Sequence, residues 1–550
     1  MLRLAASLAS SAGDRPKLIE AIRRRGLLLV LALALGLRCA GLEWGLPGPR
    51  HADSYHPDEG TVYSHAARIA TTGDLNPHFF NYGSLPLMID ALVLKLTGAV
   101  PPAPAGLGYL VLRCVSAAAG VLTVLLVALS AGRLFRNAWV GLAAGLFCAV
   151  APVHVVCSHY ATVDVMAALF LTASFLGSVR LLEEDGWQWY VLAGAGAGLA
   201  AACKYVGIAA ILPALGAHII KRRSWKALSD DRALALPGFA LVAFALGCPF
   251  AFLDPESFFR DFVFEVRHIR EGGTVALLGR PPLWFFASQV LPCALSWPLL
   301  IGVVAGLVLV IRRRRPAELM LAGWSVLLCL LHGTGREIFV RYAVAVVPFC
   351  AILFGGLLAP ATEEPQPLRR LRARAPAIAA GTAWLCGLVV AGANVALMTR
   401  PDTRDEAVEF LVPAVGRSGQ LGLANVPWFY TPPVLYLNAG PHSPRERFYE
   451  EAASKNVDLT VTGWDAGVLD MKRPEWFAVS EFEFRDALLR GDPGAVAFFA
   501  KLDADYDLAA TFEGALVVGP LRLPRPRLHD WRYVSPEIRV YHRRAGGGGT

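Results

Sequence analysis

Long apolar runs, separated by short polar segments, dominate the first 400 residues of the chain. A helix that crosses a lipid bilayer needs about 20 predominantly apolar residues, and the pattern supplies such a segment repeatedly. The stretch from Trp189 to Ile220 is too long for one helix and is interrupted by Lys204, which predicts two spans there. The stretch from Ser84 to Leu96 is short, carries Asp90 and Lys95, and predicts an interfacial helix. Eleven spans are therefore expected, which begin near Gly26, Gly106, Ala138, Thr162, Trp189, Val206, Leu234, Trp284, Ala317, Val340 and Ala377.

From Pro401 onward the pattern changes to an alternation of short helical and strand periods. Two segments have helical spacing, Asp402 to Val415 and Ala495 to Leu502. The predicted fold class is mostly α: a polytopic membrane bundle over residues 1–399, with a first outer loop at about 47–105, and a soluble α/β domain over residues 400–550. The expected strands are Val457 to Thr462, Phe477 to Ser480, Asp507 to Phe512 and Ile538 to Tyr541.

Composition supports this division. The chain is 55% hydrophobic and only 17% charged, whereas soluble proteins carry about 25% charged residues, so an ordinary soluble enzyme is excluded. The net charge of +8 does not indicate a nucleic-acid partner, because the basic residues form short clusters between apolar runs. All ten cysteines lie in or beside apolar segments and form no CxxC pair, which predicts small buried side chains rather than zinc or redox chemistry.

The basic clusters also predict which way the chain crosses the membrane. With eleven spans, every dense cluster falls on the side of the N-terminus, as the positive-inside rule requires of the cytoplasm. The domain over residues 400–550 is then extracytoplasmic, and the protein is expected to be an integral multi-pass protein of a bacterial inner (plasma) membrane. Arg38 precedes Cys39, which argues against a lipoprotein signal and favours an uncleaved first span. The clusters are Arg23 to Arg25, Arg133 with Arg136, Lys221 to Arg223, Arg312 to Arg315, and Arg369 to Arg374.

Charged residues beside the membrane are costly and are therefore candidates for function. In the first outer loop, Asp58 and Glu59 follow Pro57, a sequence that suits the first turn of a helix. From that turn the two side chains could reach a substrate at the membrane surface. A purely structural alternative is that both carboxylates only complement the helix dipole.

Further charged residues are expected on the same side of the membrane. Asp164 stands at the start of the fourth span, and Lys204 lies at a turn where it either snorkels or holds a phosphate. Arg336 and Arg341 suit bidentate phosphate contact, or else an ion pair with Glu337. Together, a carboxylate base and phosphate-holding cations on one face predict transfer of a group from a phospholipid-type carrier.

Several motifs resemble those of the GT-C superfamily of membrane glycosyltransferases, in the branch of protein O-mannosyltransferases and lipid A aminoarabinose transferases. The resemblance covers about the first 400 residues, and the later domain is only loosely similar to those appended to this branch. The motifs are His56-Pro-Asp-Glu59, Phe80-Asn-Tyr-Gly-Ser-Leu-Pro86, Ser158-His-Tyr-Ala-Thr-Val-Asp164, the segments Gly198 to Gly207 and Pro249 to Asp254, and Arg341-Tyr342 with Pro348.

This resemblance implies an inverting transfer of one sugar from a polyprenyl-phosphate sugar to a protein, lipid or glycan acceptor on the outer face. It implies that Asp58 is the general base, that Glu59 binds or orients the acceptor, and that Asp164 supports the site. Lys204 and Arg341 would contact the donor phosphate. The other expected substrate-binding residues are His56, Tyr82, His159, Tyr205, Arg336 and Tyr342.

Cofactors, partners and competing functions complete the expectations. His51, His56, Asp58 and Glu59 could be assembled into a divalent-metal site, but lysine and arginine could supply the same charge, so no metal and no other cofactor is expected. The expected partners are the lipid-linked donor, the acceptor and membrane lipid, and no nucleic acid. The main alternative is a transporter or flippase of lipid-linked sugars, which usually has charges near mid-membrane and paired repeats. Here the charges cluster at the outer ends and no repeat is visible, which favours the enzyme. A ligase or polymerase that moves a whole glycan block stays open as an alternative.

Overall fold

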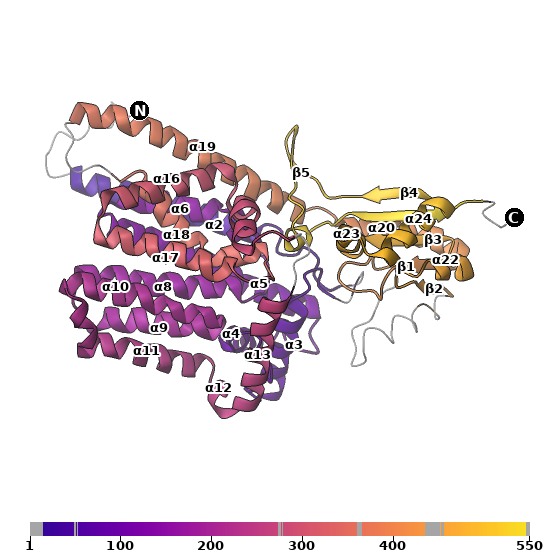
Figure 1. Cartoon of the computed structure of the whole chain (residues 1–550), viewed down its shortest axis with the longest axis horizontal. Coiled ribbons are helices and arrows are strands. Elements are labelled where there is room, and N and C mark those ends of the chain that lie inside the picture. Colours follow the sequence, from indigo (N-terminus) through magenta and orange to yellow (C-terminus); the bar gives the residue numbers. More distant parts are fainter. Residues whose placement is uncertain are drawn as a thin grey trace.

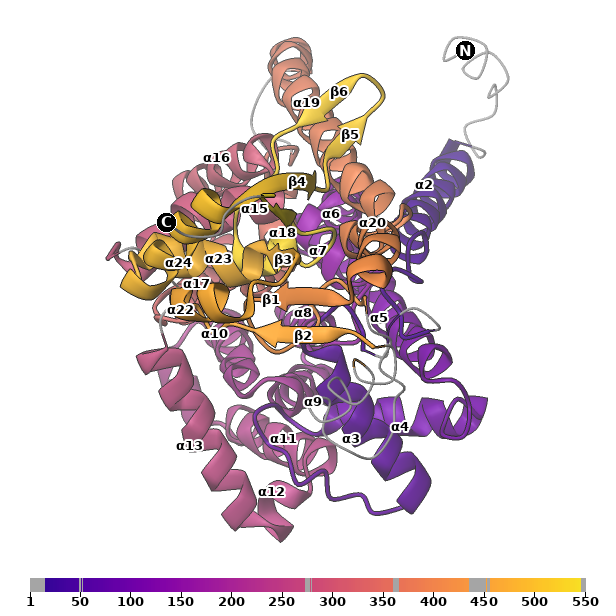
Figure 2. The same ribbon diagram turned by 90° about the vertical axis from the view of Figure 1, so that its right-hand side faces the viewer.

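The structure is a computed structural model, and it describes residues 15–48, 51, 53–272, 277, 279–359, 366–434, 452 and 456–545. A bundle of roughly parallel and antiparallel helices forms one part, and a smaller domain with a β-sheet lies at one end of that bundle (Figure 1). Figure 2, in which this smaller domain faces the viewer, shows it in front of part of the end of the bundle, with α3, α12 and α13 beside it. We call this smaller domain, residues 400–545, the tail domain.

The bundle is built from apolar helices that run along it, and further helices lie at its ends. At the end that faces the tail domain are α3 (Glu59–Thr72), α4 (Leu85–Thr97), α7 (Pro152–Cys157), α12 (Phe250–Leu253), α13 (Pro255–Glu271) and the 3-10 helices η1 (Tyr205–Ala210) and η5 (Val340–Ala345), whereas the 3-10 helix η2 (Trp225–Ser229) lies at the opposite end. The helices that run along the bundle are α2 (Arg15–Cys39), α5 (Ala105–Leu134), α6 (Ala138–Val150), α8 (Asp164–Glu183), α9 (Trp187–Cys203), α10 (Ile211–Arg222), α11 (Asp231–Gly247), α16 (Trp297–Arg313), α17 (Pro316–Gly333), α18 (Val347–Gly356) and α19 (Gln366–Met398).

Small residues allow the bundle helices to approach one another closely. A Cβ atom added at Gly177 of α8 would lie 2.6 Å from the backbone nitrogen of Ala193 in α9. On the other side of α9, a Cβ at Gly198 would overlap the carbonyl of Ala240 in α11. Helices in a membrane associate through such close packing, because lipid tails are as apolar as the side chains.

The helix lengths confirm an integral multi-pass membrane protein. Among the described residues, five helices are long and apolar enough to cross a membrane, or six if one bent pair counts as a single span. That pair, Pro282–Leu295 and Trp297–Arg313, corrects the continuous span expected from Trp284, because the chain bends by 116°. Ser296 at the bend has a φ of 71°, which no α-helix tolerates, and Pro298 is the second residue of the next helix, which begins at Trp297. The total of eleven spans stays a prediction.

The tail domain contains a five-stranded sheet in the order β2-β1-β3-β7-β4. Its first three strands are parallel, whereas β7 runs antiparallel to β3 and β4. All four predicted strands and both predicted helices of this region are present. The elements are α20 (Thr403–Ser418), β1 (Gln420–Leu423), β2 (Asp458–Val461), α22 (Ala466–Lys472), β3 (Trp476–Ser480), α23 (Glu481–Arg490), α24 (Pro493–Asp505), β4 (Tyr506–Phe512), the hairpin β5 (Leu516–Val518) and β6 (Leu521–Leu523), η6 (His529–Arg532) and β7 (Ile538–Arg543).

Buried polar contacts fix the tail domain to the segment that follows the first helix. The Trp44 indole donates a hydrogen bond to Asp402 at 2.9 Å, and the Tyr55 hydroxyl donates to Asp405 at 2.7 Å. Arg404, which is fully buried, pairs with Asp402 at 2.7 Å and lies over the Tyr55 ring. Because unpaired buried charges are strongly unfavourable, these contacts hold the tail domain in a definite position over the first outer loop.

Candidate active site

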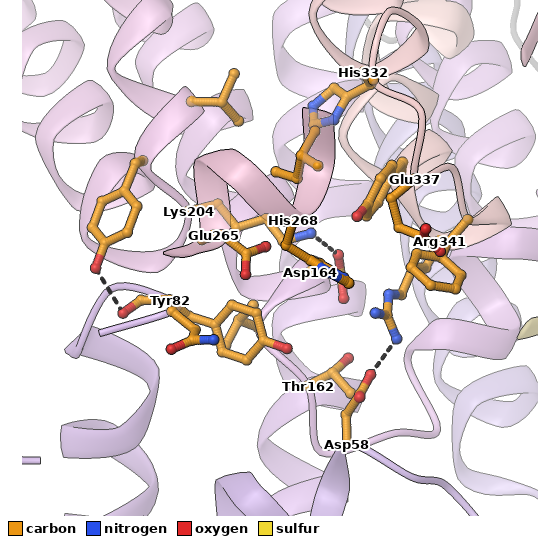
Figure 3. Close-up of a pocket in the computed structure, with 18 of the residues that line it drawn as sticks. Asp58, Tyr82, Thr162, Asp164, Lys204, Glu265, His268, His332, Glu337 and Arg341 are labelled. Carbon is orange, nitrogen blue, oxygen red and sulfur yellow. Dashed lines mark hydrogen bonds and ion pairs between the residues drawn. The ribbon is translucent and has the colours of Figure 1, made fainter. Parts of the chain in front are cut away.

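A cavity of about 660 Å³ lies where the helical bundle meets the tail domain. Its walls come from segments far apart in sequence: the start of α3, the loop before α4, the start of α8, the α9–η1 turn, α13, η5 and the tail domain. Seven of the predicted site residues line it, namely Asp58, Tyr82, Asp164, Lys204, Tyr205, Arg341 and Tyr342. Figure 3 shows acidic and basic side chains from these segments pointing toward one another.

Asp58 and Arg341 form the first ion pair in the cavity. Asp58 precedes α3 as its N-cap, but its carboxylate does not cap the helix and accepts a hydrogen bond from the Arg341 guanidinium instead. Burial raises the pKa of Asp58, and the adjacent Arg341 more than offsets this effect, so the pKa lies below its ordinary value. Asp58 is therefore ionised at neutral pH, as a general base must be.

Lys204 and Asp164 form the second ion pair, with 2.5 Å between Nζ and Oδ1. Asp164 is the first residue of α8, and Lys204 follows α9 in an extended conformation that turns its side chain toward Asp164. The Lys204 ammonium also lies 5.0 Å from the centre of the Tyr342 ring. The two pairs together place two carboxylates and two cations at the cavity, and within these pairs the charges balance.

Two residues of α13 complete the polar wall, and the motifs did not indicate them. Glu265 and His268 line the cavity from this helix, which runs across the end of the bundle rather than along it (Figure 1). Burial raises the pKa of Glu265. The signal in the sequence was the strongly amphipathic run Pro255–Glu271, whose charges rule out a membrane span and whose apolar stripe still predicts a helix lying on a surface. Glu337, considered above only as an ion-pair partner for the arginines, also lines the cavity, as does His332.

The tail domain contributes both a wall and a fixing point. Trp428, Phe429, His529 and Tyr533 line the cavity. The buried carboxylate of Asp530 accepts hydrogen bonds from the backbone N–H groups of Val340 and Arg341, both at 2.9 Å. Asp530 therefore caps the start of η5, the short helix that carries Arg341 and Tyr342.

Glu59 lies outside the cavity, although it was expected to bind or orient the acceptor. Its side chain is completely buried and accepts two hydrogen bonds from Arg113, at 2.8 and 2.7 Å. Ser54 and the backbone N–H of Ala161 donate two more, at 2.5 and 2.7 Å. These contacts leave no room for an acceptor. They join the start of α3 to the segment just before Asp164, so Glu59 holds the two halves of the site together.

His56, His159 and Arg336 also lie outside the cavity lining. His56 packs between the rings of Tyr160 and Tyr533, with centroids 4.3 and 4.9 Å away, and burial lowers its pKa to about 4. His159 is buried, with its ring nitrogens 2.9 and 2.8 Å from two backbone carbonyls. Arg336 is exposed. The two histidines are packed in the protein interior and the arginine is exposed to solvent, so none of the three lines the cavity.

Tyr205 lines the cavity but directs its hydroxyl away from it. The hydroxyl donates to the backbone carbonyls of Phe80 and Tyr82, at 2.6 and 3.0 Å. Tyr205 thus fixes the loop that carries Tyr82. Tyr205 belongs to the motif Gly198 to Gly207 and the loop belongs to the motif Phe80 to Pro86, so this contact joins two of the motifs recognised in the sequence.

The four residues considered for a divalent metal are not assembled around one point. Glu59 is held by Arg113, and the His51 ring nitrogen lies 2.6 Å from the Asp53 carbonyl oxygen. Across the described part of the chain, no group of three or more His, Cys, Asp or Glu side chains is placed to hold a metal ion.

Comparisons with known proteins agree with the geometry. Residues 105–250 match the family model described as dolichyl-phosphate-mannose-protein mannosyltransferase, a range that includes Asp164 and Lys204. No curated protein sequence gives a significant match.

Two solved structures are similar over almost the whole chain. ArnT from Cupriavidus metallidurans, bound to undecaprenyl phosphate, is 16% identical with a TM-score of 0.50, and the match covers 93% of this chain and 97% of that one. The archaeal oligosaccharyltransferase AglB from Archaeoglobus fulgidus, in complex with an inhibitory peptide and a dolichol-phosphate, is 13% identical with a TM-score of 0.54, and the match covers 94% of this chain and 77% of that one. The predicted resemblance is confirmed, and the chain has the fold of the GT-C membrane glycosyltransferases.

Proposed function

We propose that this protein is an inverting glycosyltransferase that moves a single sugar from a polyprenyl-phosphate donor to a protein, lipid or glycan acceptor. One observation carries the proposal: Asp58 and Asp164 meet Arg341 and Lys204 in a single cavity between the bundle and the tail domain. The similar structures support the choice of donor, because ArnT was solved with undecaprenyl phosphate and AglB with a dolichol-phosphate.

The charges of the cavity suit a phosphodiester. Lys204 and Arg341 each have one carboxylate partner, so each of these two ion pairs is neutral without substrate. A donor phosphate brings one negative charge, which both cations can share. Arginine binds phosphate oxygens in a bidentate manner, and lysine adds a compact positive charge.

In the reaction, the acceptor hydroxyl oxygen attacks the anomeric carbon of the sugar from the face opposite the phosphate. The bond between that carbon and the phosphate oxygen breaks, and its electron pair leaves with the polyprenyl phosphate. Asp58 takes the acceptor proton. Lys204 and Arg341 stabilise the charge that grows on the departing phosphate. No metal or other cofactor enters the proposal, because these two cations supply the positive charge.

The ion pair with Arg341 also gives a way to activate Asp58. Before the donor binds, Arg341 lowers the pKa of Asp58 and makes it a weak base. When the phosphate takes a share of Arg341, Asp58 loses part of this stabilisation and becomes more basic. Base strength then develops only when the donor is in place, which limits unproductive chemistry.

The site is further proposed to face away from the cytoplasm, in a bacterial inner membrane. The positions of the basic clusters support this orientation. A reporter fused to the C-terminus should be active only outside the cytoplasm. Activity of the reporter inside the cytoplasm would place the cavity on the wrong face for this donor.

The test of function is mass spectrometry of lipid-linked sugars in cells that lack the protein. A polyprenyl-phosphate monosaccharide should accumulate there and clear when the wild type is restored. Asp58→Asn should leave it uncleared, and Asp74→Asn, a change at an exposed aspartate after α3, should clear it. Clearance by Asp58→Asn at the wild-type rate would reject Asp58 as the base and favour a transporter.

A further inference from the structure

A second cavity, of about 570 Å³, lies on the other side of η6 from the candidate active site. Leu528 and Trp531 line this second cavity, whereas His529 and Tyr533 of the same segment line the first. The described residues that line the two cavities do not overlap. The second cavity is therefore a separate space, bounded by the bent helix pair on one side and by the tail domain on the other.

Its walls are both apolar and positively charged. Phe285, Trp297, Leu489 and Leu516 are among the apolar residues that line it. Of the described lining residues, none is Asp or Glu, whereas four are arginines: Arg280, Arg485, Arg525 and Arg527. This combination fits an amphiphile that has an anionic head.

Backbone carbonyls fix two of these arginines, Arg525 and Arg485, without cancelling their charge. The Arg525 guanidinium donates to the backbone carbonyls of Gly514 and Ser535, at 3.2 and 2.6 Å, and also to that of Val534. Arg485 donates to the carbonyl of Arg527. Four acids lie near Arg485 or Arg525, but each has another partner. Glu481 and Glu513 pair with Arg532 at 2.7 and 3.1 Å, Asp402 pairs with Arg404 at 2.7 Å, and Asp486 lies 3.9 Å from His529.

The bent helix pair adds two hydroxyl groups to this cavity. Ser288 and Ser296 line it, and the hydroxyl oxygen of each is buried without a hydrogen-bond partner in the structure. Ser288 lies in the π-helical turn Phe286–Val290, and Ser296 has the strained conformation φ 71°, ψ 150° at the 116° bend. Backbone irregularities of both kinds occur often at ligand sites, and buried hydroxyls without partners are suited to donate to phosphate oxygens.

Two exposed tryptophans indicate the level of the cavity in the membrane. Trp284 lies near the start of the first helix of the bent pair, and Trp297 is the first residue of the second helix. Their side chains are 64% and 60% exposed. Exposed tryptophan is typical of the boundary between lipid headgroups and acyl chains. The cavity is therefore beside the headgroups of the leaflet that faces the tail domain.

We propose that this cavity binds an anionic phospholipid, whose phosphate is held by the arginines and the two serines and whose acyl chain follows the apolar wall. The absence of acids among the described lining residues disfavours a zwitterionic lipid, because its cationic group would face arginines. The apolar wall disfavours free phosphate. The proposal does not rest on the glycosyltransferase function, because no residue of the first cavity takes part.

The test is native mass spectrometry of the full-length protein, delipidated in detergent and mixed with phosphatidylglycerol or phosphatidylcholine. Wild type should retain phosphatidylglycerol at least fivefold more than phosphatidylcholine. The double variant Arg485→Gln/Arg527→Gln should lose this preference, and Arg485→Lys/Arg527→Lys should keep most of it. Arg544→Gln is the matched control, because Arg544 pairs with Asp507 at the far edge of the sheet.

Equal retention of both lipids by wild type, or an unchanged preference in the glutamine variant, would overturn the proposal. Displacement of the lipid by millimolar inorganic phosphate would identify a free-anion site and overturn the lipid assignment. If the double variant fails to fold, Ser296→Gly gives a second test, because glycine adopts positive φ freely. It removes one hydroxyl and should reduce phosphatidylglycerol retention severalfold, and unchanged retention would count against the site.

Discussion

Asp58 and Glu59 are adjacent in sequence, yet their carboxylates lie in opposite environments. Asp58 faces the cavity, is 28% exposed, and has one arginine partner. Glu59 is completely buried and accepts hydrogen bonds from Arg113, Ser54 and Ala161. The difference follows from their places on α3, because the N-cap and the first helical residue point in different directions. An acidic pair at a helix start can thus combine a reactive group with the anchor that holds it.

Replacing the anchor should have the largest effect. Glu59→Gln leaves the fully buried Arg113 without its charge partner, which costs about 3–5 kcal/mol. We expect a large fall in the thermal unfolding temperature of the purified protein, together with loss of activity. Glu256→Gln, at an exposed glutamate of α13, should change stability by less than about 0.5 kcal/mol. An unfolding temperature unchanged in Glu59→Gln would contradict the anchoring role.

Replacing the reactive group should separate activity from stability. Asp58→Asn removes the base at nearly constant shape and should reduce turnover by about 10²–10⁴-fold. Because the pair with Arg341 is partly exposed, stability should change by about 1 kcal/mol or less. Turnover and unfolding temperature measured on the same preparation check both parts. Equal losses of stability in Asp58→Asn and Glu59→Gln would remove the distinction between the two carboxylates.

Asp530 affects the reactive pair of Asp58 and Arg341 indirectly, because it holds the start of η5, which carries Arg341. Asp530→Asn keeps one of the two oxygens that accept from Val340 and Arg341, so η5 should loosen without unfolding. We expect the donor concentration for half-maximal rate to rise about tenfold, equivalent to about 1.4 kcal/mol, with a smaller change at saturating donor. A purely structural role would lower the unfolding temperature and leave the donor dependence unchanged. Asp503→Asn, at an exposed aspartate of α24, is the matched control.

Local signals in the sequence predicted much of the fold and half of the site. Apolar runs located the helices, and the segments with Asp58, Asp164, Lys204 and Arg341 were each recognised as charged groups beside the membrane. Their pairing was not predicted, because it depends on packing between α3, α8, α9 and η5. The four-residue strand β1 was missed as well, since its central place in the sheet is set by β2 and β3 rather than by its own short pattern.

The other features that were not predicted depend on contacts between residues far apart in the sequence or on the conformation of a single residue. Asp530 is separated from Val340 by 190 positions, and nothing in its own segment indicates a cap on a distant helix. The bend at Ser296 was hidden within an apolar run, because hydropathy does not register a single residue of positive φ. Burial of Glu59 was similarly invisible, since its partner Arg113 lies in a helix that composition alone marks as a membrane span.

Glu483 in the tail domain extends the comparison with Glu59, because it is buried and has no cationic partner among the residues that the structure describes. It accepts hydrogen bonds from the backbone of Ser480 and Asn425, at 2.9 and 3.1 Å, and burial raises its pKa from 4.5 to about 7. The folded state therefore binds this proton more tightly than the unfolded state, and stability should fall as pH rises from 4.5 to 7, by up to about 3 kcal/mol. Glu59 behaves in the opposite sense, because Arg113 lowers its pKa against the effect of burial. In Glu483→Gln, unfolding temperatures recorded between pH 4.5 and 8 should lose this part of the decline, and a pH profile identical to wild type would show that the carboxyl stays ionised when buried.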